Sequence, residues 1–114
     1  AALEVEASLL DHPAVRQIAV IAAPDALRDE EVMACIVAPP DVARTRETAI
    51  SIQDWCLAPQ AHFKAPGFVA FIDALPTTST NKVQKTKLAD FGANPMEAPA
   101  CFDLRERKKR ERSA

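Results

Sequence analysis

One lysine of this chain lies in a setting where an amine could do chemistry. Lys82 belongs to the polar stretch 75–87, LPTTSTNKVQKTK, which follows the apolar run 68–72. Polar loops between ordered elements are common places for functional side chains, and a lysine offers a flexible cation for an anionic substrate group. The stretch also fits a solvated turn, because serine, threonine and asparagine side chains bond nearby backbone N–H groups.

The cysteines and histidines predict neither a metal site nor a set of disulfides. The three cysteines, Cys35, Cys56 and Cys101, are widely spaced, and only His12 and His62 accompany them. These residues have no recognisable metal-ligand spacing and no disulfide framework, so we expect no metal site. We expect Cys35 to be a buried hydrophobe and the histidines to lie at helix ends or on the surface. Unpaired cysteines are typical of a reducing compartment, which predicts a cytoplasmic protein.

Composition predicts one small globular domain. The 114 residues are 48% hydrophobic and 26% charged, with a net charge of −2. No apolar run reaches the roughly 18 residues of a membrane span, and the opening AALEVEASLL is too acidic for a signal peptide. The chain starts without methionine in the middle of a helical pattern, as a segment of a longer protein would.

Hydrophobic periodicity predicts a helix first and strands after it. Leu3, Ala7 and Leu10 share one face of a helix over 3–11, and Pro13 ends it, since the residue before a proline avoids the helical region. Apolar runs of strand length lie at 15–22, 32–38 and 68–72. One loop joins the first two runs, which predicts an antiparallel hairpin.

Two more helices are expected. Thr45 is suited to cap a helix, and the predicted apolar stripe of that helix contains Ile50, Asp54 and Leu57. A last helix is expected over 82–91, with Gly92 as its C-terminal stop. The order α-β-β-α-β-α predicts an α+β domain whose small, three-stranded, mainly antiparallel sheet is covered by helices.

Residues 93–114 differ in composition from residues 1–92. The run 103–112 holds six basic residues against three acids, which predicts a basic tail, helical or disordered. A nucleic-acid patch is the alternative. The run has no interleaved aromatics, and its acids would oppose the phosphates, so we expect no nucleic-acid partner.

Five motifs, in order, resemble the C-terminal domain of the adenylate-forming acyl-CoA synthetases. The stretch 75–87 resembles the signature L-P-[KR]-T-x-[ST]-G-K-[IV]-x-[KR], with Lys82 at the lysine position. The other matches are LEVE at 3–6, HPAV at 12–15, PDALRDE at 24–30 and FKAP at 63–66. Thr77 replaces the signature's basic residue and Asn81 its glycine, but asparagine tolerates the left-handed backbone that glycine favours.

This resemblance implies that residues 1–92 are the small, mobile domain of an AMP-forming acyl-CoA synthetase, similar to the carnitine and crotonobetaine CoA ligases. Lys82 would be catalytic and stabilise charge during adenylation, and Arg28, Ala65, Pro66 and Gly67 would bind coenzyme A after the domain rotates. ATP, coenzyme A and Mg²⁺ would be bound mainly by a large N-terminal domain of the same parent chain, with a small carboxylic acid as substrate. The isolated small domain would be inactive. A non-catalytic interaction module derived from such a domain is the alternative.

Overall fold

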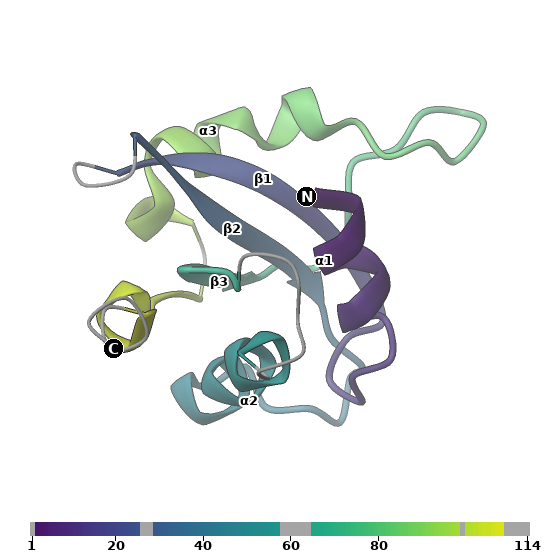
Figure 1. The fold of residues 1–114 in the computed structure, drawn as a ribbon. Helices are drawn as coiled ribbons and strands as arrows, with labels where there is room; N and C mark the ends of the chain where they lie inside the picture. The colour runs from purple at the N-terminus through teal and green to yellow at the C-terminus, as the bar shows by residue number, and fades with distance from the viewer. Residues whose placement is uncertain (1, 26–28, 58–64, 99, 109–114) are drawn as a thin grey trace.

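The computed structural model describes residues 2–25, 29–57, 65–98 and 100–108, which form one sheet with helices on both faces (Figure 1). The elements in chain order are α1 (Ala2–Leu9), β1 (Gln17–Asp25), β2 (Asp29–Val37), α2 (Arg46–Cys56), β3 (Phe68–Phe71), the 3-10 helix η1 (Lys85–Leu88), α3 (Ala89–Ala93), the 3-10 helix η2 (Pro95–Glu97) and β4 (Cys101–Asp103). None of the described helices is long and apolar enough to cross a membrane.

The sheet confirms the α+β class and the hairpin but has more strands than predicted. Its order is β1-β2-β3-β4. The β1–β2 and β3–β4 pairs are antiparallel and the β2–β3 pair is parallel. The three-stranded prediction was wrong because β4 is only three residues long, too short for an alternating pattern. The parallel pair arises because the chain crosses over through α2 between β2 and β3.

Alternate side chains of β2 enter two hydrophobic clusters, one on each face of the sheet. Ala34 and Ile36 join the cluster covered by α1 and α2, whereas Met33 and Cys35 join the cluster covered by η1 and α3. Cys35 is fully buried, as predicted. Burial on both faces explains why this strand reads as a continuous apolar run.

The first two helices were predicted, but most of their buried residues were not. In α1 the buried residues are Val5 and Leu9, whereas Leu3 is 78% and Leu10 53% exposed. Thr45 caps α2 as predicted, since its side chain accepts a hydrogen bond from the Thr48 N–H. The predicted stripe on α2 was right in part. Ile50 and Leu57 are partly buried and pack against the core, whereas Asp54 is exposed. The buried residues of α2 are Ala49, Ile52, Gln53 and Cys56.

The last helix begins later than predicted and does not stop at Gly92. Helical structure starts at Lys85 as 3-10 turns and continues through α3 to Ala93. Gly92 lies buried inside α3, where a Cβ atom would overlap the carbonyl oxygen of Ala22. Glycine is therefore needed there for close packing of α3 on β1.

His12 lies in the turn after α1, where its N–H donates to the Leu9 carbonyl oxygen, and it is buried, so the helix-end prediction holds and a surface position does not. Its Nδ1 accepts from the Ala14 N–H at 2.9 Å, and its Nε2 lies 2.9 Å from Ser51 Oγ. Burial lowers the pKa of the His12 ring. Trp55 packs against this ring and donates to the Ser8 carbonyl oxygen. His62 lies outside the described residues.

Candidate functional site: a lysine arm and a buried loop

Lys82 is carried by a small hairpin, residues 76–84, which we call the lysine arm. Thr77 and Val83 form an antiparallel bridge, and the Gln84 N–H donates to the Pro76 carbonyl oxygen at 2.8 Å. The Thr78 N–H donates to the Lys82 carbonyl oxygen at 2.8 Å. Backbone pairing therefore gives this polar loop a defined shape.

Two side chains shape the tip of the lysine arm. Asn81 has φ 65°, the left-handed conformation proposed from its match to the signature's glycine. Thr78 Oγ1 accepts from the Lys82 N–H at 3.2 Å and from the Thr80 N–H at 3.3 Å. The hydroxyl-rich sequence thus satisfies the backbone of the turn.

The Lys82 side chain is exposed at the end of this arm, which extends from the body of the molecule (Figure 1). It makes no ion pair or side-chain hydrogen bond with any residue that the structure describes. Lys85, at the base, pairs with Glu6 of α1 at 2.7 Å, and Glu6 also accepts from the Val20 N–H. The base is fixed, and the Lys82 ammonium is available to an anion.

Residues 65–67, which we call the buried loop, precede β3 and are all buried. The Gly67 N–H donates to the Val32 carbonyl oxygen at 2.9 Å. The three carbonyl oxygens of the loop also have partners. Ala65 accepts from Lys108 Nζ at 2.6 Å, Pro66 from Gln53 Nε2 at 2.9 Å and Gly67 from the Leu104 N–H at 2.8 Å.

The buried loop and the lysine arm lie toward opposite ends of the molecule. Phe68 pairs with Met33 in the middle of β2, and the Gly67 N–H donates to the Val32 carbonyl oxygen, so the loop lies beside the half of β2 nearer the hairpin. Phe71 at the end of β3 pairs with Ile36, and the arm follows from that other end. The longest dimension is 46 Å. Arg28, predicted to bind coenzyme A, lies outside the described residues, between the ends of β1 and β2.

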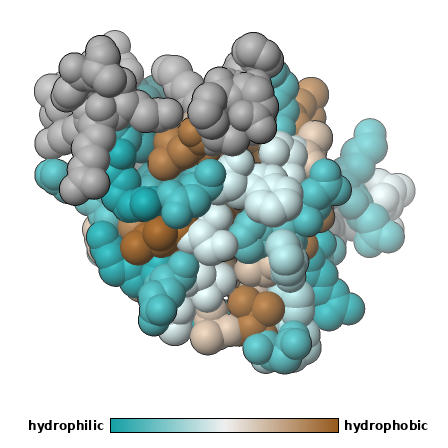
Figure 2. Space-filling model, turned by 60° about the horizontal axis from the view of Figure 1, so that its bottom comes forward, coloured by the Kyte–Doolittle hydropathy of each residue, from teal (hydrophilic) through white to brown (hydrophobic). Residues whose placement is uncertain are grey.

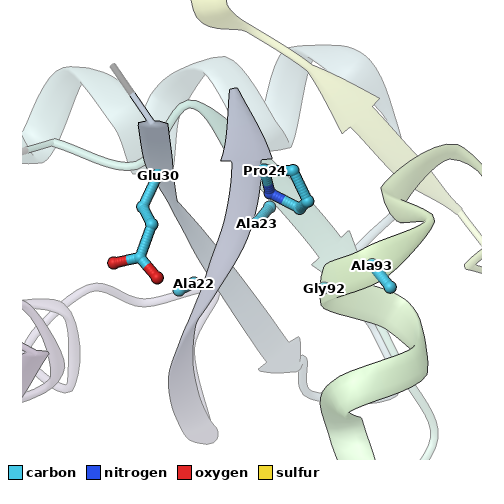
Figure 3. Close-up of a pocket in the computed structure, with 6 residues that line it drawn as sticks. All are labelled: Ala22, Ala23, Pro24, Glu30, Gly92 and Ala93. Carbon is cyan, nitrogen blue, oxygen red and sulfur yellow. The ribbon is translucent and has the colours of Figure 1, made fainter. Parts of the chain in front are cut away.

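A shallow hollow of about 290 Å³ lies between the end of the β1–β2 hairpin and α3 (Figure 3). It is lined by Ala22, Ala23, Pro24, Glu30, Gly92 and Ala93. Among these described lining residues Glu30 has the only ionisable side chain. The described part of the lining therefore lacks the convergent polar groups of a small-molecule site.

The described cysteines and acids offer no other reactive centre. Burial raises the pKa of the Cys35 thiol to about 12 and that of Cys101 to about 11. Both thiols are therefore protonated, and poor nucleophiles, at neutral pH. Within the described residues no group of three or more His, Cys, Asp or Glu side chains could hold a metal ion.

The described basic residues of the predicted tail are paired with acids. Arg105 contacts Asp25 and Asp103, and Arg107 contacts Asp54, in each case at 2.8–2.9 Å. On the face shown in Figure 2, hydrophobic side chains form small patches among hydrophilic ones. Neither feature indicates a broad basic or apolar docking face on this side of the molecule.

Sequence reasoning missed the groups that hold the buried loop: Glu31, Gln53, Leu104 and Lys108. Glu31 is the last residue of the acidic stretch 29–31, directly before the apolar run 32–38, so no local pattern separates it from a solvated charge. Gln53 is fully buried, although the sequence placed Asp54 on the inner face instead. No local pattern marks Lys108 within its basic run.

Comparisons with known proteins agree with this fold and these motifs. The model of the AMP-binding enzyme C-terminal domain matches residues 4–82. A probable CoA ligase, CCL11, from Humulus lupulus is 40% identical over 89 residues, covering 78% of this chain and 16% of that protein. The mitochondrial acyl-coenzyme A synthetase ACSM5 of Homo sapiens is 39% identical over 88 residues, covering 75% of this chain and 15% of that protein.

A solved structure gives the same result. The anthranilate CoA ligase AuaEII, in complex with anthranoyl-AMP, superposes with a TM-score of 0.72 at 33% identity, covering 84% of this chain and 19% of that one. The fold and the motif hairpin define a small domain of the adenylate-forming enzyme class. The chain belongs to the family of AMP-binding enzyme C-terminal domains. It spans only 15–16% of the length of these two curated relatives.

Proposed function

We propose that this chain is the C-terminal domain of an ATP-dependent carboxylate–CoA ligase and that it serves the two half-reactions with two different ends. The observation that carries the proposal is the exposed ammonium of Lys82, which pairs with no described residue. It lies on the lysine arm, which follows β3, whereas the buried loop precedes β3. The family match and the CoA ligases among its relatives support it. Residues 1–92 would form the mobile domain, and 93–114 an extension whose strand β4 joins the sheet of that domain.

In the first half-reaction a carboxylate oxygen attacks the α-phosphate of ATP, and pyrophosphate leaves as the acyl-adenylate forms. Negative charge builds up on the phosphate and carboxylate oxygens during this step. A cation placed there stabilises the transition state more than the separated reactants. Lys82 is proposed to supply this cation, because its side chain is exposed and carried on a hairpin with a defined backbone.

In the second half-reaction the thiol of coenzyme A attacks the acyl carbonyl carbon, and AMP leaves. The domain is proposed to rotate, withdrawing Lys82 and presenting its other end. Arg28 would contact a phosphate of coenzyme A, since a guanidinium fork suits phosphate oxygens. Ala65, Pro66 and Gly67 would line the channel. Their carbonyl oxygens already accept hydrogen bonds inside the domain. We therefore propose that these residues shape the channel wall and do not bind coenzyme A through these oxygens.

The remaining groups of the reaction are proposed to be bound elsewhere in the parent protein. ATP, the carboxylic acid and Mg²⁺ would be held mainly by a large N-terminal domain, the main partner of this chain. The described residues offer no acidic cluster for Mg²⁺, so none is assigned to it. Membership of the carnitine branch and a cytoplasmic location both stay predictions.

The test is Lys82→Ala in the full-length protein, with each half-reaction measured separately. Acid-dependent pyrophosphate exchange should fall by a factor of about 10² or more, as expected when a main transition-state contact is lost. Thioester formation from supplied acyl-adenylate should be kept. Lys87→Ala is the matched control, because it removes the same charge from an exposed position in η1. Equal activity of Lys82→Ala and wild type in both assays would overturn the proposal.

A further inference from the structure

We propose that Lys108 is a positioning residue for the thioester half-reaction, and that it acts by fixing the buried loop through Glu31. This inference rests on the proposed function. It concerns a residue beyond the matched family region, which ends at Lys82.

The C-terminal segment 101–108 is built into the domain. Its strand β4 pairs with β3, and Leu104 is fully buried in the core. Arg105 lies over the Phe68 ring at 4.7 Å and contacts Asp25 at the hairpin end of β1. The segment therefore crosses the end of the sheet where the buried loop lies.

Lys108 is a buried cation that contacts both β2 and the buried loop. It is 6% exposed, and Glu31 is 2% exposed. Lys108 Nζ lies 2.6 Å from Glu31 Oε1 and 2.6 Å from the carbonyl oxygen of Ala65. Charges at this depth are stable only when paired and hydrogen-bonded. The ammonium thus joins β2 to the start of the buried loop.

Glu31 in turn fits against the other end of the buried loop. A Cβ atom on Gly67 would lie 2.5 Å from both Cγ and Cδ of Glu31. The carboxylate is thus held between Lys108 and the Gly67 backbone, and Oε1 also accepts from the Val32 N–H at 2.8 Å. A shift of Glu31 would move both ends of the loop.

Gln53 completes the set of contacts from the opposite side. Its Nε2 donates to the carbonyl oxygens of Pro66 and Leu104, each at 2.9 Å. Its Oε1 accepts from Arg107 at 2.8 Å. The carbonyl oxygens of Ala65 and Gly67 therefore accept directly from the C-terminal segment. The carbonyl oxygen of Pro66 accepts from Gln53, which also donates to the segment. Small displacements of groups that line a site have large effects on rate.

The first experiment is Lys108→Met in the full-length protein, compared with Arg44→Met, which breaks an exposed ion pair with Asp73. We expect the apparent KM for coenzyme A to rise about tenfold, with pyrophosphate exchange unchanged, because only the loop moves. Arg44→Met should change neither. An unchanged KM for coenzyme A in Lys108→Met would overturn the inference.

A double variant separates positioning from stability. Glu31→Gln with Lys108→Met removes both charges of this buried pair, so thermal stability should recover toward wild type. The Ala65 carbonyl still lacks its ammonium, so the KM for coenzyme A should stay raised. Recovery of that KM together with stability would mean that Lys108 only supports the fold, and would overturn the positioning role.

Amide hydrogen exchange tests the same contact without catalysis. In Lys108→Met the Gly67 N–H should exchange about tenfold faster, because local opening of the loop becomes easier. Unchanged exchange would overturn the inference whatever the protein catalyses. If the wild-type protein shows no acid-dependent pyrophosphate exchange, the proposed function fails, and the Gly67 measurement still decides whether Lys108 holds the loop.

Discussion

The two ends of this domain are built in opposite ways. The lysine arm is held by hydrogen bonds between near neighbours, such as Gln84 to Pro76 and Lys82 to Thr78, and the Lys82 side chain is exposed. The buried loop is held by residues from distant parts of the chain, including Lys108, 43 positions from Ala65. A hairpin with local contacts can enter another domain's site without disturbing its own domain's core. A channel wall needs a fixed backbone.

This difference predicts that mutations in the two regions change stability unequally. The largest loss is expected where the C-terminal segment packs beside the buried loop. Leu104→Ala should lower the free energy of unfolding by about 3 kcal/mol, because it removes a fully buried side chain and leaves a cavity. Chemical denaturation of the 114-residue chain measures this. Leu10→Ala, at a site 53% exposed, is the matched control and should change stability little. Equal effects at both sites would show that the C-terminal segment is not part of the core.

A smaller loss is expected at Gly67. Gly67→Ala places a methyl group against Glu31, whose side chain is already held by Lys108. Overpacking of this kind costs about 1–3 kcal/mol. The same denaturation experiment gives the value. A variant as stable as wild type would mean that Glu31 moves aside freely, which would weaken the contrast between the two ends.

The smallest effect on stability is expected in the lysine arm. Asn81→Ala introduces a side chain that tolerates the left-handed conformation poorly. The substitution should destabilise the folded hairpin by about 1 kcal/mol relative to its locally open form. Global unfolding should therefore change little, while amide exchange at Lys82 should increase. Asn81→Gly is the control and should keep the turn. A large fall in global stability would show that the arm is coupled to the core.

Part of the candidate site could be predicted from sequence because its signals are local. The polar turn beside Lys82 follows from neighbouring residues. The left-handed conformation of Asn81, with φ 65°, was expected from its match to the glycine of the family signature. The cap at Thr45 and the β1–β2 hairpin are likewise short-range features. The roles of Lys82, Arg28 and the buried loop came from the resemblance and stay proposals.

Other features could not be read from neighbouring residues. The apolar positions of α2 permitted more than one buried face, and packing against the sheet selected the face that contains Gln53. Gly92 looked like a helix stop, but it is required where α3 meets the backbone of β1. Three residues, Cys101–Asp103, carry too little pattern to predict the strand that closes the sheet.

The sequence by itself determined the polar loop that precedes Lys82, the β1–β2 hairpin, the first two helices and the α+β class, since each depends on residues a few positions apart. Only the tertiary structure decided that Lys108 reaches Glu31, 77 positions away, and that both hold the buried loop. The physical reason is that a buried ion pair depends on the exclusion of water by the whole fold. No short stretch of sequence carries that information.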